Sequence, residues 1–399
     1  MAEKQIAKKS ERVHAFDKLE DLVGQYQKVT HWFGFDIFRD DYKLNGALFY
    51  SFFVTICYTV NCVSWAVVAG KKGDLNELLN SICCIFTSFQ HQCKILSVIF
   101  CRQEIYAVHG EVLRLTRSAT GEAETTFYKF NLLYEKIGKT IFYLYATAVG
   151  TFCINPLLSY IITGNVEPMF NVKFPGMDND TVTGYIVNTI GGMMVMSNTG
   201  TVFAACDAWT CYYFLFTGEY EELIEQKIQY MNRKILESEQ DGTLRNKKKL
   251  AEFHKMLIDS IKTSQDVEKF FNQMKFFEIL CLGQISCISA TMMCSIIVMK
   301  ITGWVTLLTY IAAHFFQLAG YSIAGTYIET KYERLQVSIY SLPWFYLSIP
   351  DQKLFQFFLQ NSQTPKKFYL MGAQSINVAT GLAIVKSIYS VIIMLDNVI

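Results

Sequence analysis

Five residues spaced three and four apart near the end of the chain form the pattern with the clearest chemical meaning. They are Ala383, Ser387, Ser390, Met394 and Asn397. Because residues three or four apart share one face of a helix, they would form a continuous stripe. If this stripe lines a pore, Met394 is placed to form an apolar constriction that gates by dewetting, with Asn397 as a polar ring outside it. The alternative is that the stripe packs against neighbouring helices.

The sequence contains no pattern of a catalytic or metal site. None of the six histidines stands at metal-ligand spacing from another. The twelve cysteines lie within or at the ends of apolar segments, as small buried hydrophobes do, and indicate no disulfide framework. The lysine run 247–249 adjoins a membrane segment, where such a run sets topology or attracts anionic lipid. We therefore expect no enzyme, no cofactor, no metal and no nucleic-acid partner.

The stripe belongs to one of several apolar segments that are long enough to cross a lipid bilayer. Hydrophobic residues make up 51% of the chain and charged residues 18%, so the chain is more apolar than an ordinary soluble protein. A membrane-spanning helix needs roughly 20 mostly apolar residues. The sequence therefore predicts an all-α polytopic membrane protein with seven transmembrane helices. They cover residues 47–68, 75–101, 140–162, 185–216, 271–298, 305–327 and 368–399. The second segment is interrupted by polar residues and could instead be a buried amphipathic helix.

The positions of Lys and Arg predict the orientation, because cytoplasmic loops retain positive charge. Basic residues concentrate in the N-terminal stretch and in the loops after the second, fourth and sixth segments. The N-terminus is therefore expected in the cytoplasm and the C-terminus outside the cell. The sequon Asn179-Asp180-Thr181 agrees, because it falls in a loop that the charges place outside.

These segments divide the chain into four parts. Residues 1–44 form a cytoplasmic amphipathic region, in which His14 to Phe38 either lies on the membrane surface or packs on the cytoplasmic ends of the bundle. Residues 45–329 hold the first six transmembrane helices, with long helical extensions of the fourth and fifth into the cytoplasm. Residues 330–367 are apolar enough to pack against those extensions as an anchor or oligomerisation segment. Residues 368–399 form the last helix, which carries the stripe.

The C-terminal motifs, together with this topology, resemble insect odorant receptors. They are Tyr340-Ser341-Leu342-Pro343-Trp344-Phe345, the stretch Asn361 to Lys367, and Lys386-Ser387-Ile388-Tyr389-Ser390. The stretch 371–374 departs from the family pattern, in which many members have a pair of small residues followed by aromatics. The odorant subgroup therefore stays open.

This resemblance implies a ligand-gated, non-selective cation channel in the plasma membrane, expected in the dendrites of olfactory sensory neurons. Odorant-tuning members of the family assemble with a shared odorant receptor co-receptor into heterotetramers, in which the last helix of each subunit lines a central pore. The co-receptor has a larger cytoplasmic loop before the fifth span. The modest loop of residues 218–270 fits a tuning subunit better.

A small volatile organic ligand is expected in the outer half of the bundle, in a mostly apolar pocket with a few polar groups. Aromatic and methionine side chains suit such ligands, because shape and dispersion contacts bind them without a need for charge. Each candidate alone is more often a core residue than a ligand contact. The candidates are Phe86, Phe89, Gln90, Thr147, Gly150, Thr151, Ile154, Met193, Met196, Ser197, Thr309, Tyr310 and Phe316.

Three other classes of membrane protein could have a similar number of spans. A G-protein-coupled receptor would have its N-terminus outside and a cysteine that ties its second extracellular loop. A secondary transporter would show an internal repeat with broken helices in matching positions. An insect gustatory receptor would share the topology and the pore, but its ending differs from Lys-x-x-Tyr-Ser.

We expect an N-linked glycan at Asn179, because the charge pattern places this loop in the lumen during synthesis. Treatment with an endoglycosidase should increase the electrophoretic mobility of the wild-type chain and leave that of Asn179→Gln unchanged. The control variant combines Asn179→Gln with Asp241→Asn, which completes a sequon of the same form ahead of Gly242-Thr243 in a loop predicted to be cytoplasmic. A glycan on this control variant, together with none on the wild-type chain, would contradict the predicted orientation.

Overall fold

The computed structural model is helical over nearly all of the residues that it describes. These are residues 14–31, 34, 45–163, 174, 176–177, 181–302, 307–370 and 374–396. The helices are α2 (Ala15–Thr30), α3 (Gly46–Lys72), α4 (Leu75–Phe100), α5 (Arg102–Ser118), α6 (Glu122–Thr163), α7 (Val182–Gln240), α8 (Lys247–Met274), α9 (Phe276–Thr302), α10 (Leu307–Tyr340), α11 (Ile349–Ser362) and α12 (Val378–Asp396). A 3₁₀ turn, η2 (Trp344–Tyr346), and two short strands, β1 (Tyr369–Leu370) and β2 (Gln374–Ser375), complete them.

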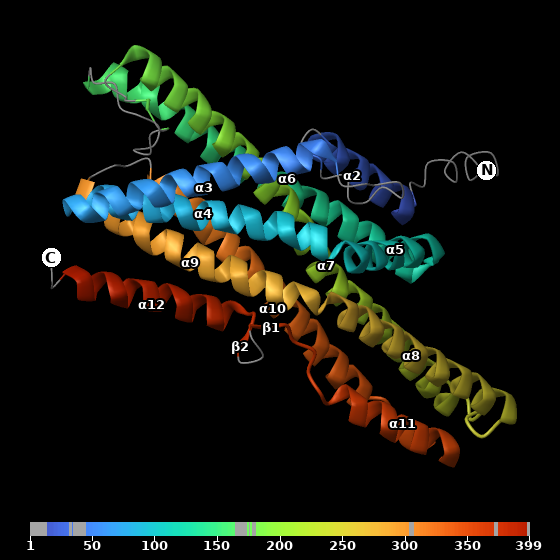
Figure 1. Cartoon of the computed structure of the whole chain (residues 1–399). Coiled ribbons are helices and arrows are strands. Elements are labelled where there is room, and N and C mark those ends of the chain that lie inside the picture. Colours follow the sequence, from blue (N-terminus) through green and yellow to red (C-terminus); the bar gives the residue numbers. More distant parts are fainter. Residues whose placement is uncertain are drawn as a thin grey trace.

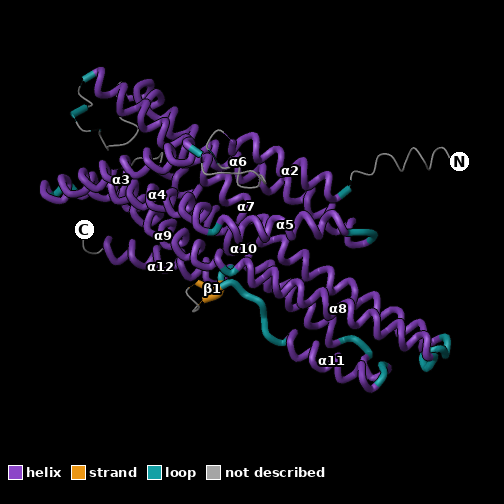
Figure 2. Tube along the Cα trace, turned by 45° about the vertical axis from the view of Figure 1, so that its right-hand side comes forward, coloured by secondary structure: helices purple, strands orange, loops and turns teal. Residues whose placement is uncertain are grey.

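The helices form one elongated bundle with two different ends (Figure 1). At one end lie the beginnings of α4, α7 and α10 and the ends of α3, α6, α9 and α12. The other end holds α2, α5, α8 and α11, together with the last parts of α7 and α10. Turned by 45°, the molecule shows the same extension of α8 and α11 away from the rest of the bundle (Figure 2). The helix ends that border loops predicted to share a side of the membrane therefore lie at the same end of the bundle.

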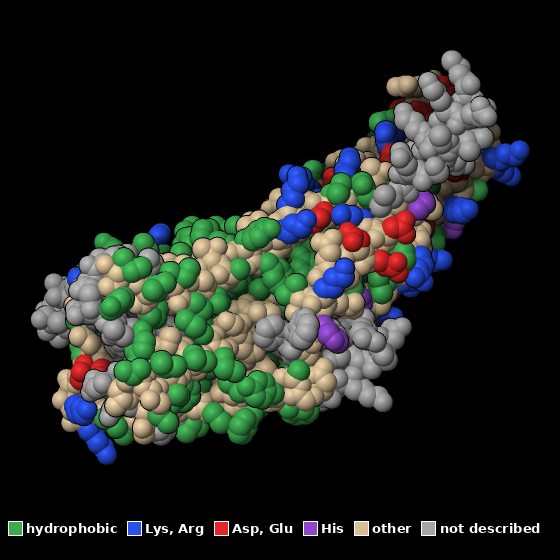
Figure 3. All heavy atoms as spheres, turned by 90° about the horizontal axis from the view of Figure 1, so that it is seen from above, with side chains coloured by type: hydrophobic (Ala, Val, Ile, Leu, Met, Phe, Trp, Pro, Cys, Tyr) green, Lys and Arg blue, Asp and Glu red, His purple; other side chains and the backbone are tan. Residues whose placement is uncertain are grey.

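Charged side chains are separated along this long axis (Figure 3). One half of the visible surface shows hydrophobic and uncharged side chains, with a few charges at its tip, and we call it the apolar half. The other, the charged half, carries Lys, Arg, Asp, Glu and His side chains. An uncharged belt of this kind is what the hydrocarbon core of a bilayer requires.

Five helical stretches in the described residues are long and apolar enough to cross a membrane. They are Gly46–Lys72, Leu75–Phe100, Glu122–Leu157, the stretch Lys247–Ile301 across α8 and α9, and Leu307–Tyr340. A shorter apolar helix covers Val378–Met394. The fourth predicted segment is helical as part of α7, which is more polar and contributes buried residues along its whole length. A helix face that is buried against other helices need not be as apolar as a face exposed to lipid. The all-α polytopic membrane fold is thus confirmed.

The helix α2 forms within the region predicted to be amphipathic, and it packs on the bundle. Leu19 and Leu22 are buried in the main core. The Asn131 side chain on α6 donates a hydrogen bond to the carbonyl of Ala15 at 3.0 Å. Of the two alternatives for this region, the structure shows packing on the helical bundle for α2.

Two predicted boundaries were wrong. The last predicted segment, 368–399, is not one helix: Tyr369–Leu370 pairs antiparallel with Gln374–Ser375, and α12 begins only at Val378. Asn377 causes this start, because its side chain accepts a hydrogen bond from the Thr380 backbone N–H at 3.0 Å, as a helix N-cap does. The fifth segment, predicted from 271 onward, is divided between α8 and α9 at Lys275.

Close contact between α10 and the residues that precede α12 makes Gly325 a sensitive position. A Cβ atom at Gly325 would overlap the backbone carbonyl of Ile376, whereas one at Gly320 on the same helix would meet nothing within 4 Å. We expect Gly325→Ala to destabilise the fold by about 1–3 kcal/mol, as overpacking does. Gly320→Ala should be neutral or stabilising, because alanine favours a helix over glycine by about 1 kcal/mol. Thermal unfolding of the purified variants in detergent measures both, and equal midpoints would contradict the close approach.

Candidate ligand site and polar core of the bundle

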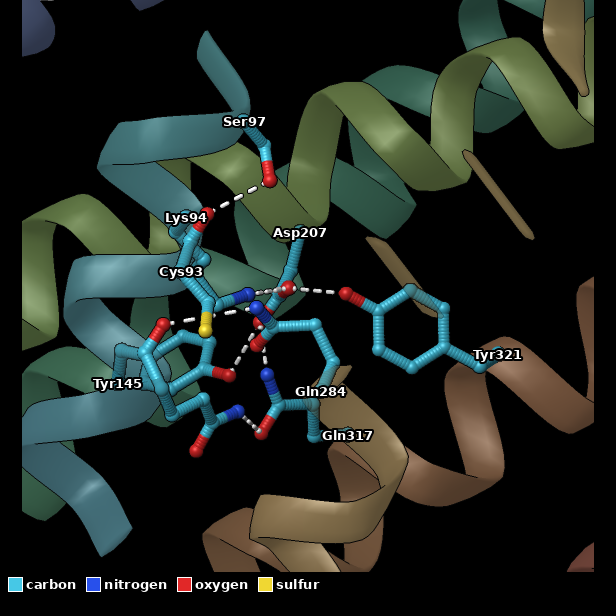
Figure 4. Close-up of polar contacts among 9 residues, drawn as sticks. Cys93, Lys94, Ser97, Tyr145, Asp207, Gln284, Gln317 and Tyr321 are labelled. Atoms are coloured by element: carbon cyan, nitrogen blue, oxygen red, sulfur yellow. Dashed lines mark hydrogen bonds and ion pairs between the residues drawn. The ribbon is translucent and has the colours of Figure 1, made fainter. Parts of the chain in front are cut away.

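An ion pair joins Lys94 on α4 and Asp207 on α7 in the interior of the bundle (Figure 4). The two side chains are 0% and 9% exposed. The Asp207 carboxylate also accepts hydrogen bonds from the Tyr321 hydroxyl at 2.7 Å, the Gln317 amide at 2.8 Å and the Tyr145 hydroxyl at 2.5 Å. Four donors thus surround one buried carboxylate, which is what a charge needs in order to be tolerated away from water.

This polar network connects five helices. Tyr145 belongs to α6, while Gln317 and Tyr321 belong to α10 and are one helical turn apart. Gln90 on α4 donates to the side-chain carbonyl oxygen of Gln317 at 2.9 Å, and Gln284 on α9 donates to the Gln90 backbone carbonyl at 3.5 Å. Ionisable side chains inside a membrane protein are costly and mark functional positions. The network is therefore a functional candidate in its own right.

Two recesses reach the ion pair. One, of about 510 Å³ with its open mouth included, is lined by Asp207 and by Tyr145, Phe316 and Gln317. The other, of about 460 Å³ measured in the same way, is lined by Lys94 together with residues of α5, α7 and α9. Each member of the ion pair thus lines one of the two recesses.

A separate apolar cluster lies nearer the beginning of α10, toward the end of the apolar half that is farther from the charged half. It contains Phe152, Met196 and Tyr310, with Met193 packed against them, and we call it the outer cluster. The ring centroids of Phe152 and Tyr310 are 5.4 Å apart in an edge-on arrangement. The Tyr310 hydroxyl is hydrogen-bonded to that of Thr87. Sulfur and aromatic groups of this kind pack adaptably against one another.

His314 adds a polar group to the same region. Its Nδ1 atom is bonded to the Tyr310 carbonyl at 3.0 Å, and its ring centroid lies 4.5 Å from that of Tyr310. The side chain is buried, and its Nε2 atom has no hydrogen-bond partner among the described residues. Because a buried polar atom without a partner is costly, Nε2 is suited to bond a polar atom of a ligand.

Comparison with known proteins identifies the family. The family model described as "7tm Odorant receptor" matches residues 74–389.

The chain belongs to the odorant receptor family.

A curated relative is the putative odorant receptor 83c of Drosophila melanogaster, which is 26% identical over 271 residues. The match covers 62% of this chain and 65% of the relative, so the chain spans somewhat less than two thirds of that protein. Among solved structures, the olfactory receptor OR5 from Machilis hrabei in complex with eugenol has a TM-score of 0.80 at 11% identity. The structural match covers 96% of this chain and 100% of the OR5 chain. A second structure of OR5 from Machilis hrabei has a TM-score of 0.78 at 12% identity, and the match covers 95% of this chain and 98% of that one.

The receptor is thus a multi-pass membrane protein of a family whose insect members are ligand-gated cation channels. Membership of this family also decides against the gustatory receptor, G-protein-coupled receptor and transporter alternatives. Within the described residues, no group of three or more His, Cys, Asp or Glu side chains is placed to hold a metal ion.

The predicted ligand residues of the receptor fall into three groups by exposure. Buried are Gln90, Met196 and Tyr310; partly buried are Phe86, Gly150, Thr151, Met193 and Thr309; exposed on the surface of the single chain are Phe89, Thr147, Ile154, Ser197 and Phe316. Met193, Met196 and Tyr310 come together in the outer cluster. Gln90 instead belongs to the polar network, and Phe316 lines the recess beside Asp207. Ligand contact by any of them stays a prediction.

The predicted pore stripe of the receptor is exposed along α12. Ala383, Ser387, Ser390 and Met394 are all exposed, while Gly381 and Ile388 on other faces are buried against the bundle. The hydroxyl groups of the two serines donate to backbone carbonyls of their own helix at 2.9 Å. Asn397 and the glycosylation candidate Asn179 lie outside the described residues. The stripe is therefore not covered by other parts of the same chain.

Sequence reasoning did not find Asp207, Tyr145, Tyr321, Gln317 or His314. A signal for Asp207 was present in the sequence, because Lys94 and Asp207 are opposite charges that both lie within predicted spans. Charged residues inside a membrane tend to pair with one another. This rule would have predicted the ion pair between Lys94 and Asp207.

We expect Asp207→Leu alone to destabilise the receptor by about 3–5 kcal/mol, because it leaves the Lys94 ammonium buried without its counter-charge. The double variant Lys94→Met with Asp207→Leu removes both charges and should recover much of that loss. Thermal unfolding in detergent and the amount of receptor at the cell surface are the measurements. If the double variant is as unstable as the single one, the charge pairing is not the cause.

Proposed function

We propose that this receptor is an odorant-tuning subunit of a non-selective cation channel, opened by a small volatile molecule bound in the outer half of the bundle. The observation that carries the proposal is the outer cluster around Tyr310. Its sulfur and aromatic side chains lie next to the His314 imidazole, whose buried Nε2 atom has no hydrogen-bond partner among the described residues. Such a site favours a largely apolar, uncharged ligand that carries one hydrogen-bonding group.

The structural relative supports a small ligand of this kind. OR5 from Machilis hrabei has been solved in complex with eugenol, and its fold covers 96% of this chain. In this receptor, the hydrogen bond between Tyr310 and Thr87 joins α10 to α4 at the site. A ligand that inserts there would change how these two helices contact each other.

The helix α10 provides a route from the ligand site to the pore. It carries Tyr310 and His314 in the outer region, then Gln317 and Tyr321 in the polar network. One turn further on, Gly325 lies against the residues that precede α12, and the Thr326 hydroxyl accepts a hydrogen bond from the Val378 backbone N–H at 2.9 Å. A ligand can open the channel through this route only if it binds the open state more tightly than the closed state.

We further propose that the exposed stripe of α12, with Asn397 beyond it, lines a central pore in a heterotetramer with the odorant receptor co-receptor. The exposure of Ala383, Ser387, Ser390 and Met394 supports this, because a pore-lining face is not covered within a single subunit. Such a complex would act in the plasma membrane of olfactory neuron dendrites.

Cells that express the receptor with the co-receptor should show a rapid cation current when small volatile odorants are applied. The current should need both chains and persist when G-protein signalling is blocked. Once an active odorant is found, Tyr310→Ala should raise its half-maximal concentration by about tenfold or more, which corresponds to about 1.4 kcal/mol of lost contacts. Phe315→Ala, an exposed aromatic on the same helix, is the matched control and should leave it unchanged.

Pore substitutions separate permeation from ligand binding in the same assay. Met394→Ala and Asn397→Asp should change rectification or ion selectivity while leaving the half-maximal odorant concentration close to that of wild type. If surface receptor is present and no odorant in a broad panel evokes current, the channel proposal fails.

A further inference from the structure

A carboxylate is buried in the charged half of the molecule, where α7 meets the segment that leads into α12. Glu221 on α7 is 0% exposed. Neither of its side-chain oxygens has a hydrogen-bond partner among the described residues. This contrasts with Asp207, whose carboxylate receives four donors. An ionised carboxylate without donors is so costly in a protein core that it takes up a proton instead.

The neighbouring cations compensate Glu221 only in part. Lys331 on α10 is engaged elsewhere, because its ammonium group is 2.6 Å from the carboxylate of Glu222 and 3.8 Å from that of Glu219. The other cation is Lys366, in the segment between α11 and β1. Its ammonium group lies 5.7 Å from the centre of the Tyr332 ring on α10, a cation–π contact.

Charges from each surrounding element act on this pair. Burial raises the pKa of Glu221 to about 8, and Lys366 and Lys331 oppose that rise. Burial also lowers the pKa of Lys366, against the opposing effect of Glu221 and of Glu268 on α8. Both forms of Glu221 are therefore accessible near neutral pH.

The residues that directly follow Lys366, on the way to α12, are packed against the bundle. Phe368 stacks on Phe214 of α7 with ring centroids 4.5 Å apart, and its ring centroid is 4.6 Å from that of Phe271 on α8. The next residue, Tyr369, donates its backbone N–H to Glu278 on α9 at 3.1 Å. A displacement of Lys366 would therefore act on the packing from which α12 departs.

We propose that Glu221 is a proton-binding site that responds to cytoplasmic pH and, through Lys366, adjusts the segment leading into α12. In the protonated state the carboxyl is neutral, and Lys366 stays over the Tyr332 ring. When Glu221 releases its proton to cytoplasmic water, the new negative charge attracts the Lys366 ammonium group. The cytoplasmic location follows from the orientation predicted from the basic residues. Proton binding itself is independent of the proposed channel function, whereas its effect on current rests on that function.

Infrared spectroscopy of the purified full-length receptor tests proton binding directly. At neutral pH the wild type should show the C=O band of a protonated carboxyl group, and Glu221→Gln should lose it. Glu225→Gln is the matched control, because Glu225 lies one turn further along α7 and its carboxylate already accepts a hydrogen bond from Ser338 at 3.0 Å. The control should keep the band. A band that survives Glu221→Gln unchanged would overturn the proposal.

The pH dependence of stability provides a second readout with a definite sign. Between the ordinary pKa of a glutamate, about 4.3, and its value in the fold, about 8, the folded receptor keeps a proton that the unfolded chain has released. Glu221 therefore makes stability fall as pH rises through this interval, and its contribution levels off above it. Glu221→Gln should show a shallower fall in thermal midpoint than wild type and Glu225→Gln. Identical slopes would count against the site.

Current recorded from inside-out patches tests the consequence for the channel. With the co-receptor present and an active odorant applied, a step in cytoplasmic pH across neutrality should change the open probability by up to about tenfold per pH unit, the limit for one proton. Glu221→Gln should behave at every pH as the wild type does at acidic pH, and Lys366→Met should weaken the response. Full pH sensitivity in Glu221→Gln would overturn the coupling. If no odorant evokes current, the proposed function fails and the infrared band alone decides whether Glu221 binds a proton.

Discussion

The attraction between Lys94 and Asp207 is the interaction on which the arrangement of the bundle most depends. In a bilayer, helices gain little from the hydrophobic effect when they associate, because lipid tails are as apolar as their side chains. A buried charge pair changes this, since neither charge is tolerated without the other. The hydroxyl and amide groups that complete the Asp207 shell then determine which faces of α6 and α10 turn inward.

The same network lies between the region proposed for the ligand and the region proposed for the pore. The helix α10 passes from the outer cluster, through the network, to its contact with the residues before α12. Its orientation is thus constrained at three levels along its own length. A change in packing at Tyr310 can be transmitted as a rigid rotation or shift of α10, because a continuous helix of 34 residues resists internal bending.

Helix positions were predictable from the sequence because a bilayer demands long apolar runs, and a helix stands at each predicted segment. The rotation of each helix about its own axis was not predictable. A span that is apolar on every side has no face that must turn inward. Phe89 and Gln90 illustrate this: adjacent in sequence and both predicted to contact ligand, one is 51% exposed and the other fully buried. Asp207 was overlooked because its partner is 113 residues away. The start of α12 was signalled locally by Asn377, yet the apolar run before it concealed the signal.

The separation of Lys94 from its partner along the chain also constrains biosynthesis. The segment with Lys94 emerges from the ribosome 113 residues before Asp207, and a solitary lysine at that depth opposes partitioning into lipid. We therefore expect the α4 segment to be inserted less efficiently on its own than after α7 has been translated. Retention in the endoplasmic reticulum is thus the natural consequence of damage to either residue, before any question of odorant response arises.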